Sequence, residues 1–165
     1  MFPTTSAPSG TNTAQRAAAH LPVPLPVGLR EEADSMSFDE FHATYASTSG
    51  PVRLGQWECT DGYRPSTRLG PQARNYRATI AVADRISTAT AAASGPIAAL
   101  TSMLYDRGVA VELLKFHQLA ADDGIATFVH GTNGSADEWA MGMSGDATQS
   151  ALRAMIACAN RLLAA

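Results

Sequence analysis

The feature that most constrains the fold is a pattern that occurs twice in the last two thirds of the sequence. Three short strand-like stretches are followed each time by a turn of small residues that contains glycine, and then by a helical pattern. An internal repeat of about fifty residues indicates two similar structural units. Each three-stranded sheet has an apolar face that must be covered, so the two units need each other. We therefore predict an α+β fold built from two pseudo-repeated βββα units.

The strands of the first unit are separated by turn residues. Apolar and polar residues alternate over Tyr76–Val82, which is typical of a half-buried strand. Pro96 suits the first position of a helix with Gly95 before it, and Gly108 suits the position just after the helix. We predict strands over Val52–Cys59, Tyr76–Val82 and Ile86–Ala92, a polar loop over Arg64–Arg74, and a helix that starts at Pro96.

The second unit repeats this order. The sequence Thr132–Ser135 is typical of a hairpin turn, and Asp146 with Gln149 has the spacing of a helix cap. We predict strands over Val109–Gln118, Ile125–His130 and Glu138–Met143, followed by a helix whose apolar face includes Ala151, Met155, Ala159 and Leu162.

The residues before the repeat differ in composition. Residues 1–35 are rich in proline, serine and alanine, and we expect them to form a disordered tail. Residues 36–50 predict a short linker helix, because Ser37 and Glu40 have the capping-box spacing and aromatic residues follow at helical intervals. The predicted domain then covers residues 51–165.

Length, charge and cysteine content limit the functional classes. The chain has 165 residues, too few for a (β/α)8 barrel. The net charge of −3 argues against a nucleic-acid partner, and no run of about 20 apolar residues predicts a membrane span. Two distant cysteines, Cys59 and Cys158, and a start without a secretory signal favour reduced thiols in a cytoplasmic protein.

The sequence contains little that predicts catalysis. It has no GxSxG elbow, Walker A loop or HExxH pair. His117 and His130 fall on adjacent predicted strands and could hold a metal weakly, although partly exposed strand residues are the commoner interpretation. We therefore expect no catalytic residues, no metal and no cofactor.

The two strand-to-helix turns are better candidates for a binding site. At Ser94–Ile97, glycine permits close approach to the backbone, and the helix start directs free N–H groups outward, which suits a carboxylate. Ile97, Leu113, Phe116 and Met143 could surround an apolar side chain. Together these features fit a free aliphatic amino acid; the alternative is that the turns are ordinary caps and the apolar residues belong to the core.

Several ordered motifs carry a resemblance to a known family. The segment from Tyr76 to Leu163 resembles the C-terminal regulatory (dimerisation) domain of 2-isopropylmalate synthases, which make the first committed step of leucine biosynthesis and are inhibited by leucine. Residues 38–45 and Pro51 resemble the linker helix before that domain. The matching stretches are Ser94–Leu100, Gly108–His117, Asp122–Val129, Trp139–Met143 and Ser150–Arg161.

The resemblance implies a dimer that binds leucine or a related branched-chain amino acid near its interface. Carried over by position, the ligand-binding residues are Ser94, Gly95, Pro96, Ile97, Ala98, Leu113, Phe116, Ala120 and Met143. Partners are then the amino acid, a second copy, and a synthase catalytic chain regulated in trans. The family's catalytic barrel has no counterpart here, so we expect no 2-isopropylmalate synthase activity from this stand-alone chain.

Two departures from the family pattern define the alternative. Ala93 stands where the family has a glycine, and Lys115 stands where it usually has an acidic residue. The first adds a methyl group near the backbone, and the second removes a partner for an ammonium group. These changes favour a ligand-free dimerisation scaffold; a small enzyme using His117 and His130 is a third hypothesis.

Overall fold

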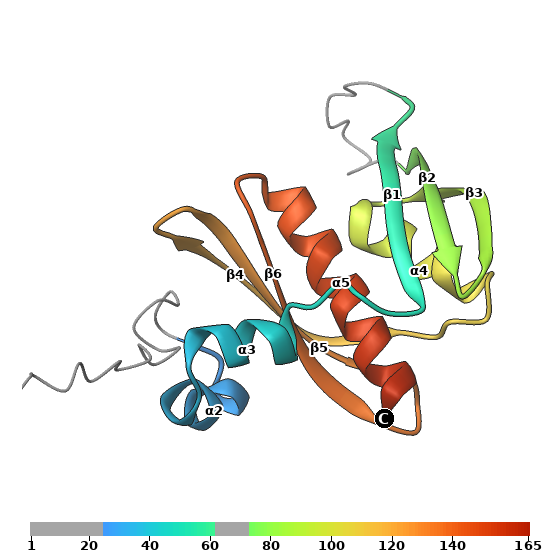
Figure 1. Cartoon of the computed structure of the whole chain (residues 1–165). Coiled ribbons are helices and arrows are strands. Elements are labelled where there is room, and N and C mark those ends of the chain that lie inside the picture. The colour runs from blue at the N-terminus through green and yellow to red at the C-terminus, as the bar shows by residue number, and fades with distance from the viewer. Residues whose placement is uncertain (1–24, 62–72) are drawn as a thin grey trace, which may run out of the picture.

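The computed structural model describes residues 25–61 and 73–165, and Figure 1 shows them as two antiparallel sheets with helices. The fold is α+β and compatible with the two predicted βββα units. The first sheet has the strand order β1-β2-β3 and the second β4-β5-β6. The first unit comprises β1 (Val52–Cys59), β2 (Arg74–Val82), β3 (Arg85–Ala93) and α4 (Pro96–Tyr105). The second comprises β4 (Glu112–Ala121), β5 (Gly124–Thr132), β6 (Asp137–Ser144) and α5 (Ala147–Ala164).

One predicted strand begins later than expected. The prediction started the fourth strand at Val109, whereas β4 starts at Glu112. The Val109 amide donates to the Leu104 carbonyl at 2.9 Å after the turn at Gly108, whose φ is +82°. That amide still closes the end of α4, so it cannot join a strand ladder. Val109 and Val111 are nevertheless buried in the core.

The main core lies where the two units meet. Helix α4 packs on β3, and α5 packs on β5, β6, β1 and α4. Leu100 and Met103 of α4 and Leu152 and Met155 of α5 are fully buried in one apolar cluster with residues of both sheets. The C-terminal helix therefore joins the two sheets through a shared core, as expected for units that cannot bury their faces alone.

The second sheet is covered on both faces. Helix α5 packs on one face, here called the helix face. The opposite face, here called the outer face, packs against the N-terminal segment, residues 25–46 (Figure 1). This segment contains η1 (Val27–Leu29), α2 (Arg30–Ser35) and α3 (Phe38–Tyr45). Phe41 of α3 and Phe128 of β5 are fully buried in this second cluster.

The expected disordered tail requires a correction. Residues 25–35 were assigned to that tail, but they form η1 and α2, and Leu29 and Ala33 are fully buried. Their apolar side chains cover the outer face, and this burial offsets the loss of conformational freedom. The rest of the predicted tail, residues 1–24, and residues 64–72 of the predicted polar loop lie outside the described residues.

The predicted helix caps are present. The Ser37 hydroxyl accepts a hydrogen bond from the Glu40 amide at 3.2 Å, and Asp146 accepts one from the Gln149 amide at 2.8 Å. Both side chains satisfy amides that have no partner within their helix. In the described parts of the chain, no helix is both long and apolar enough to cross a membrane.

Candidate functional site

The first predicted binding element is the turn from β3 into α4. Gly95 is the N-cap of α4, and no side chain caps this helix. Pro96 has no amide hydrogen, so Ile97 and Ala98 supply the first free N–H groups. A Cβ added to Gly95 would meet no atom within 4 Å, which shows open space beside the turn. The geometry offers backbone donors and a positive dipole end to an anion.

The corresponding turn of the second unit is closed. The Asp146 carboxylate lies at the start of α5 and accepts from the Gln149 amide. It occupies the position in which an external carboxylate would lie. The two turns, alike in sequence position, therefore differ chemically: α5 carries its own anion, and α4 does not.

The second predicted element is β4. Leu113 pairs with Gly131, Phe116 with Val129, and Ala120 with Ile125. Directly paired residues share a face, and Val129 belongs to the core beneath α5, so all three β4 residues lie on the helix face. Phe116 is 41% exposed and Ala120 is exposed, because α5 covers β5 and β6 rather than this edge strand.

Met143 lies elsewhere. It pairs with Ala126 and packs with the cluster on the outer face. Its side chain is therefore on the opposite side of the sheet from Phe116 and Ala120. The structure brings Ile97 and Leu113 to the same core cluster, but it does not gather all nine predicted residues into one cavity of a single chain. Their role in ligand binding stays a prediction.

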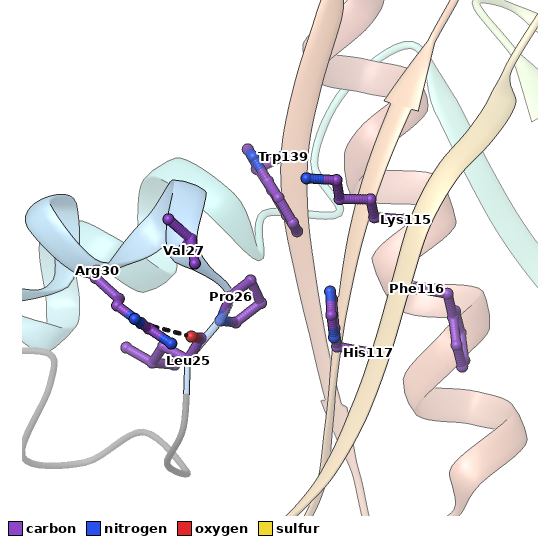
Figure 2. Close-up of a pocket in the computed structure, with 8 residues that line it drawn as sticks. All are labelled: Leu25, Pro26, Val27, Arg30, Lys115, Phe116, His117 and Trp139. Atoms are coloured by element: carbon purple, nitrogen blue, oxygen red, sulfur yellow. Dashed lines mark hydrogen bonds between the residues drawn. The ribbon is translucent and has the colours of Figure 1, made fainter.

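Sequence reasoning missed a cavity on the outer face. A space of about 480 Å³ separates the start of the N-terminal segment from β4 and β6 (Figure 2). Figure 2 shows Lys115, His117 and Trp139 on the side of the sheet that faces Pro26, whereas the Phe116 side chain points away to the other side. The lining residues are Leu25, Pro26, Val27, Arg30, Lys115, Phe116, His117 and Trp139.

Aromatic stacking fixes one wall of this cavity. The rings of His130 and Trp139 stack with centroids 4.9 Å apart and planes within 10°. The His117 ring lies on the same wall, 6.3 Å from Trp139. His130 Nε2 is 2.6 Å from Asp137 Oδ2, which anchors the stack, while His130 Nδ1 is buried and has no hydrogen-bond partner among the described residues.

The two histidines of the metal hypothesis thus lie on one face of the sheet, and both stack against the same indole. In the part of the chain that the structure describes, no three His, Cys, Asp or Glu side chains gather as a metal site. Their arrangement is that of an aromatic wall rather than a ligand set. The spacing of Lys115 and His117 places them on one face of β4, but their approach to Trp139 depends on the pairing of β4, β5 and β6.

The N-terminal segment fits closely against this wall. A Cβ added to Gly28 would lie 2.5 Å from Trp139 Nε1, so glycine permits the backbone to approach the indole. Further along the segment, the Arg161 guanidinium of α5 lies 4.5 Å from the centroid of the Tyr45 ring. Burial is the main cause of the raised pKa of Tyr45, and nearby Glu32 adds to it.

Comparison with known proteins gives one informative similarity. No family model matches the chain. The 2-isopropylmalate synthase of Renibacterium salmoninarum is 35% identical over 74 residues, which are 42% of this chain and 13% of that protein. The chain thus corresponds to a small part of that enzyme's length. This sequence similarity shows a partial relation to 2-isopropylmalate synthase.

Proposed function

We propose that this chain is a regulatory domain of the 2-isopropylmalate synthase type, linked to leucine biosynthesis in the cytoplasm. It binds leucine, or a related branched-chain amino acid, as a homodimer. The observation that carries the proposal is the 35% identity to a 2-isopropylmalate synthase. The two βββα units agree with the fold that the resemblance implies.

The open start of α4 supports the carboxylate part of this proposal. The Ile97 and Ala98 amides have no side-chain cap, and there is space beside Gly95. An amino-acid carboxylate would complete the helix as Asp146 completes α5. The ligand in this proposal therefore replaces a missing cap.

The exposure of the predicted β4 residues supports the dimer. Phe116 and Ala120 lie on an edge strand that α5 leaves uncovered, so one chain alone does not enclose an aliphatic side chain there. A second copy would supply the other wall. Met143, on the opposite face, is the least consistent member of the predicted set.

Calorimetry tests the ligand. We expect saturable heat on titration with leucine, and weaker heat with valine and isoleucine, together with a dimer in sedimentation. The variant Phe116→Asp should reduce the affinity for leucine at least about tenfold, because it places a carboxylate against the apolar side chain of the bound leucine. Ile86→Asp is the matched control, since Ile86 is another exposed apolar residue, 71% exposed, and lies outside the predicted site.

The outcomes separate the proposal from its alternative. A dimer that gives no heat at millimolar leucine, isoleucine or valine would identify a ligand-free dimerisation scaffold. Equal leucine affinity in the Phe116→Asp and Ile86→Asp variants would exclude the β4 surface from the site.

A further inference from the structure

The cavity on the outer face has the size and walls of a small-molecule site. Its volume of about 480 Å³ falls in the range typical of ligand pockets. One wall consists of apolar residues of the N-terminal segment, Leu25, Pro26 and Val27. The facing wall contains the Trp139 and His117 rings (Figure 2). A flat apolar group between these walls would contact carbon on both sides.

The aromatic wall is held in place before any ligand arrives. Trp139 stacks on His130, and His130 is fixed by Asp137. The Gly28 backbone packs against one end of the Trp139 indole. Side chains that are already ordered lose little further freedom on binding, which favours affinity.

The charges in the cavity are of one sign. The lining residues that the structure describes include the cations Arg30 and Lys115 and no carboxylate. Within residues 25–61 and 73–165, Lys115 takes part in none of the ion pairs. Arg30 donates from Nε to the Leu25 carbonyl at 2.9 Å, which leaves its terminal nitrogens available. Asp137 and Glu138 are paired with His130 and Arg161.

We propose that this cavity binds a small organic carboxylate that has a flat apolar body and no amino group. The body lies between Trp139 and the Leu25–Val27 wall, and the carboxylate meets the Lys115 ammonium, with Arg30 as a second cation of the lining. An amino acid is disfavoured because the described lining contains two cations and no carboxylate that could pair with its ammonium group. Although Phe116 belongs to the lining, its side chain points to the other side of the sheet (Figure 2), so this cavity is distinct from the leucine site proposed above.

Three probes with the same phenylpropyl skeleton, which differ only in their charged groups, test the proposed charge preference on the full chain. They are 3-phenylpropanoate, phenylalanine, which adds an ammonium group, and 3-phenylpropanamide, which lacks the negative charge. Titration is followed by calorimetry and by Trp139 fluorescence in a Trp57→Phe background, since the chain has two tryptophans. We expect 3-phenylpropanoate to bind and to quench Trp139, and the other two to bind at least about tenfold more weakly.

The variant Lys115→Met tests whether the Lys115 ammonium group binds the carboxylate. Lys115 is exposed, so the substitution leaves the core unchanged, and Arg85→Met removes an exposed cation from a distant turn as the matched control. We expect Lys115→Met to reduce the affinity for 3-phenylpropanoate at least about tenfold, and Arg85→Met to leave this affinity unchanged. The proposal is overturned if 3-phenylpropanoate does not bind at 10 mM (about −2.7 kcal/mol). It is equally overturned if the three probes bind alike or if Lys115→Met has no effect. Leucine titration of the same samples shows whether the first site remains intact.

Discussion

Asn160, near the end of α5, holds Val52 at the start of β1 through two hydrogen bonds. Its Oδ1 accepts from the Val52 amide at 2.8 Å, and its Nδ2 donates to the Val52 carbonyl at 2.9 Å, across 108 residues of sequence. Asn160 is 8% exposed and Val52 is fully buried. Gly50 makes room for this amide, because a Cβ there would lie 2.5 Å from Asn160 Cγ. One side chain thus pairs the backbone of the first unit with the helix of the second.

Asn160→Ala should lower the free energy of unfolding by about 2–4 kcal/mol, because it removes two hydrogen bonds and leaves a buried amide and carbonyl without partners. Urea unfolding followed by circular dichroism measures this loss. Asn75→Ala is the control, since Asn75 makes side-chain hydrogen bonds to Asp61 at an exposed position. A loss no larger than that of the control would contradict a stabilising role for the pairing.

Gly142→Ala should be among the most destabilising single changes in the second unit. A Cβ there would collide with the Ser150 carbonyl oxygen and lie 2.5 Å from the Ala154 nitrogen, so α5 would have to move off β6. We expect a loss of about 3 kcal/mol or more, or failure to fold. Gly145→Ala is the control, because a Cβ there meets nothing within 4 Å. Similar melting temperatures for the two variants would contradict the close packing of helix on strand.

Because the Cys158 thiol is buried, we expect the protein to lose stability at high pH. Burial raises the pKa of its thiol to about 11, with the Arg161 charge opposing the shift. The unfolded chain ionises this thiol near pH 8.5, so between about pH 9 and pH 11 it binds fewer protons than the folded chain, and stability falls as pH rises. Cys158→Ala should show a smaller fall between pH 8 and pH 10.5. Burial also raises the pKa values of Tyr45 and Tyr76, and their contribution persists in both proteins. Identical pH profiles would contradict the assignment.

Gly28→Val should displace the N-terminal segment from the second sheet. The added side chain would overlap Trp139, which lies 2.5 Å from the Cβ position. We expect the Trp139 emission in a Trp57→Phe background to shift to the red, and residues 25–35 to become sensitive to protease. Gly134→Val is the control, because nothing lies within 4 Å of a Cβ in that exposed turn, although its φ of +92° makes some local strain unavoidable. An unchanged emission spectrum would show that the segment does not pack against this indole.

The local pattern of the sequence predicted most of the regular structure. Alternation, turn residues and cap spacing act over a few residues, and these located six strands and both repeat helices. It was harder to predict on which face of the sheet each β4 side chain lies. A bulge between Leu113 and Lys115 places Phe116 on the same side as Leu113, which simple alternation does not do. Such an irregularity depends on pairing with β5 and leaves no local sequence signal.

The cavity and the covered outer face were not predictable in the same way. They require residues 25–30 to meet Lys115 and Trp139, a tertiary contact between distant segments. Prolines in the N-terminal segment favoured disorder, although Leu25, Leu29 and Ala33 recur at a spacing of four, typical of one helix face. That periodicity was the signal that could have corrected the prediction.

The contact between β1 and α5, across 108 residues of sequence, has a consequence for the order of folding. Strand β1 is the first strand to be made, yet its start is fixed by Asn160, within the last eighteen-residue helix. Contacts so distant in sequence form late, because loop closure must precede them. During translation, the first sheet therefore keeps an incomplete core until α5 has left the ribosome. Truncating α5 before Asn160 would remove the side chain that anchors the start of β1.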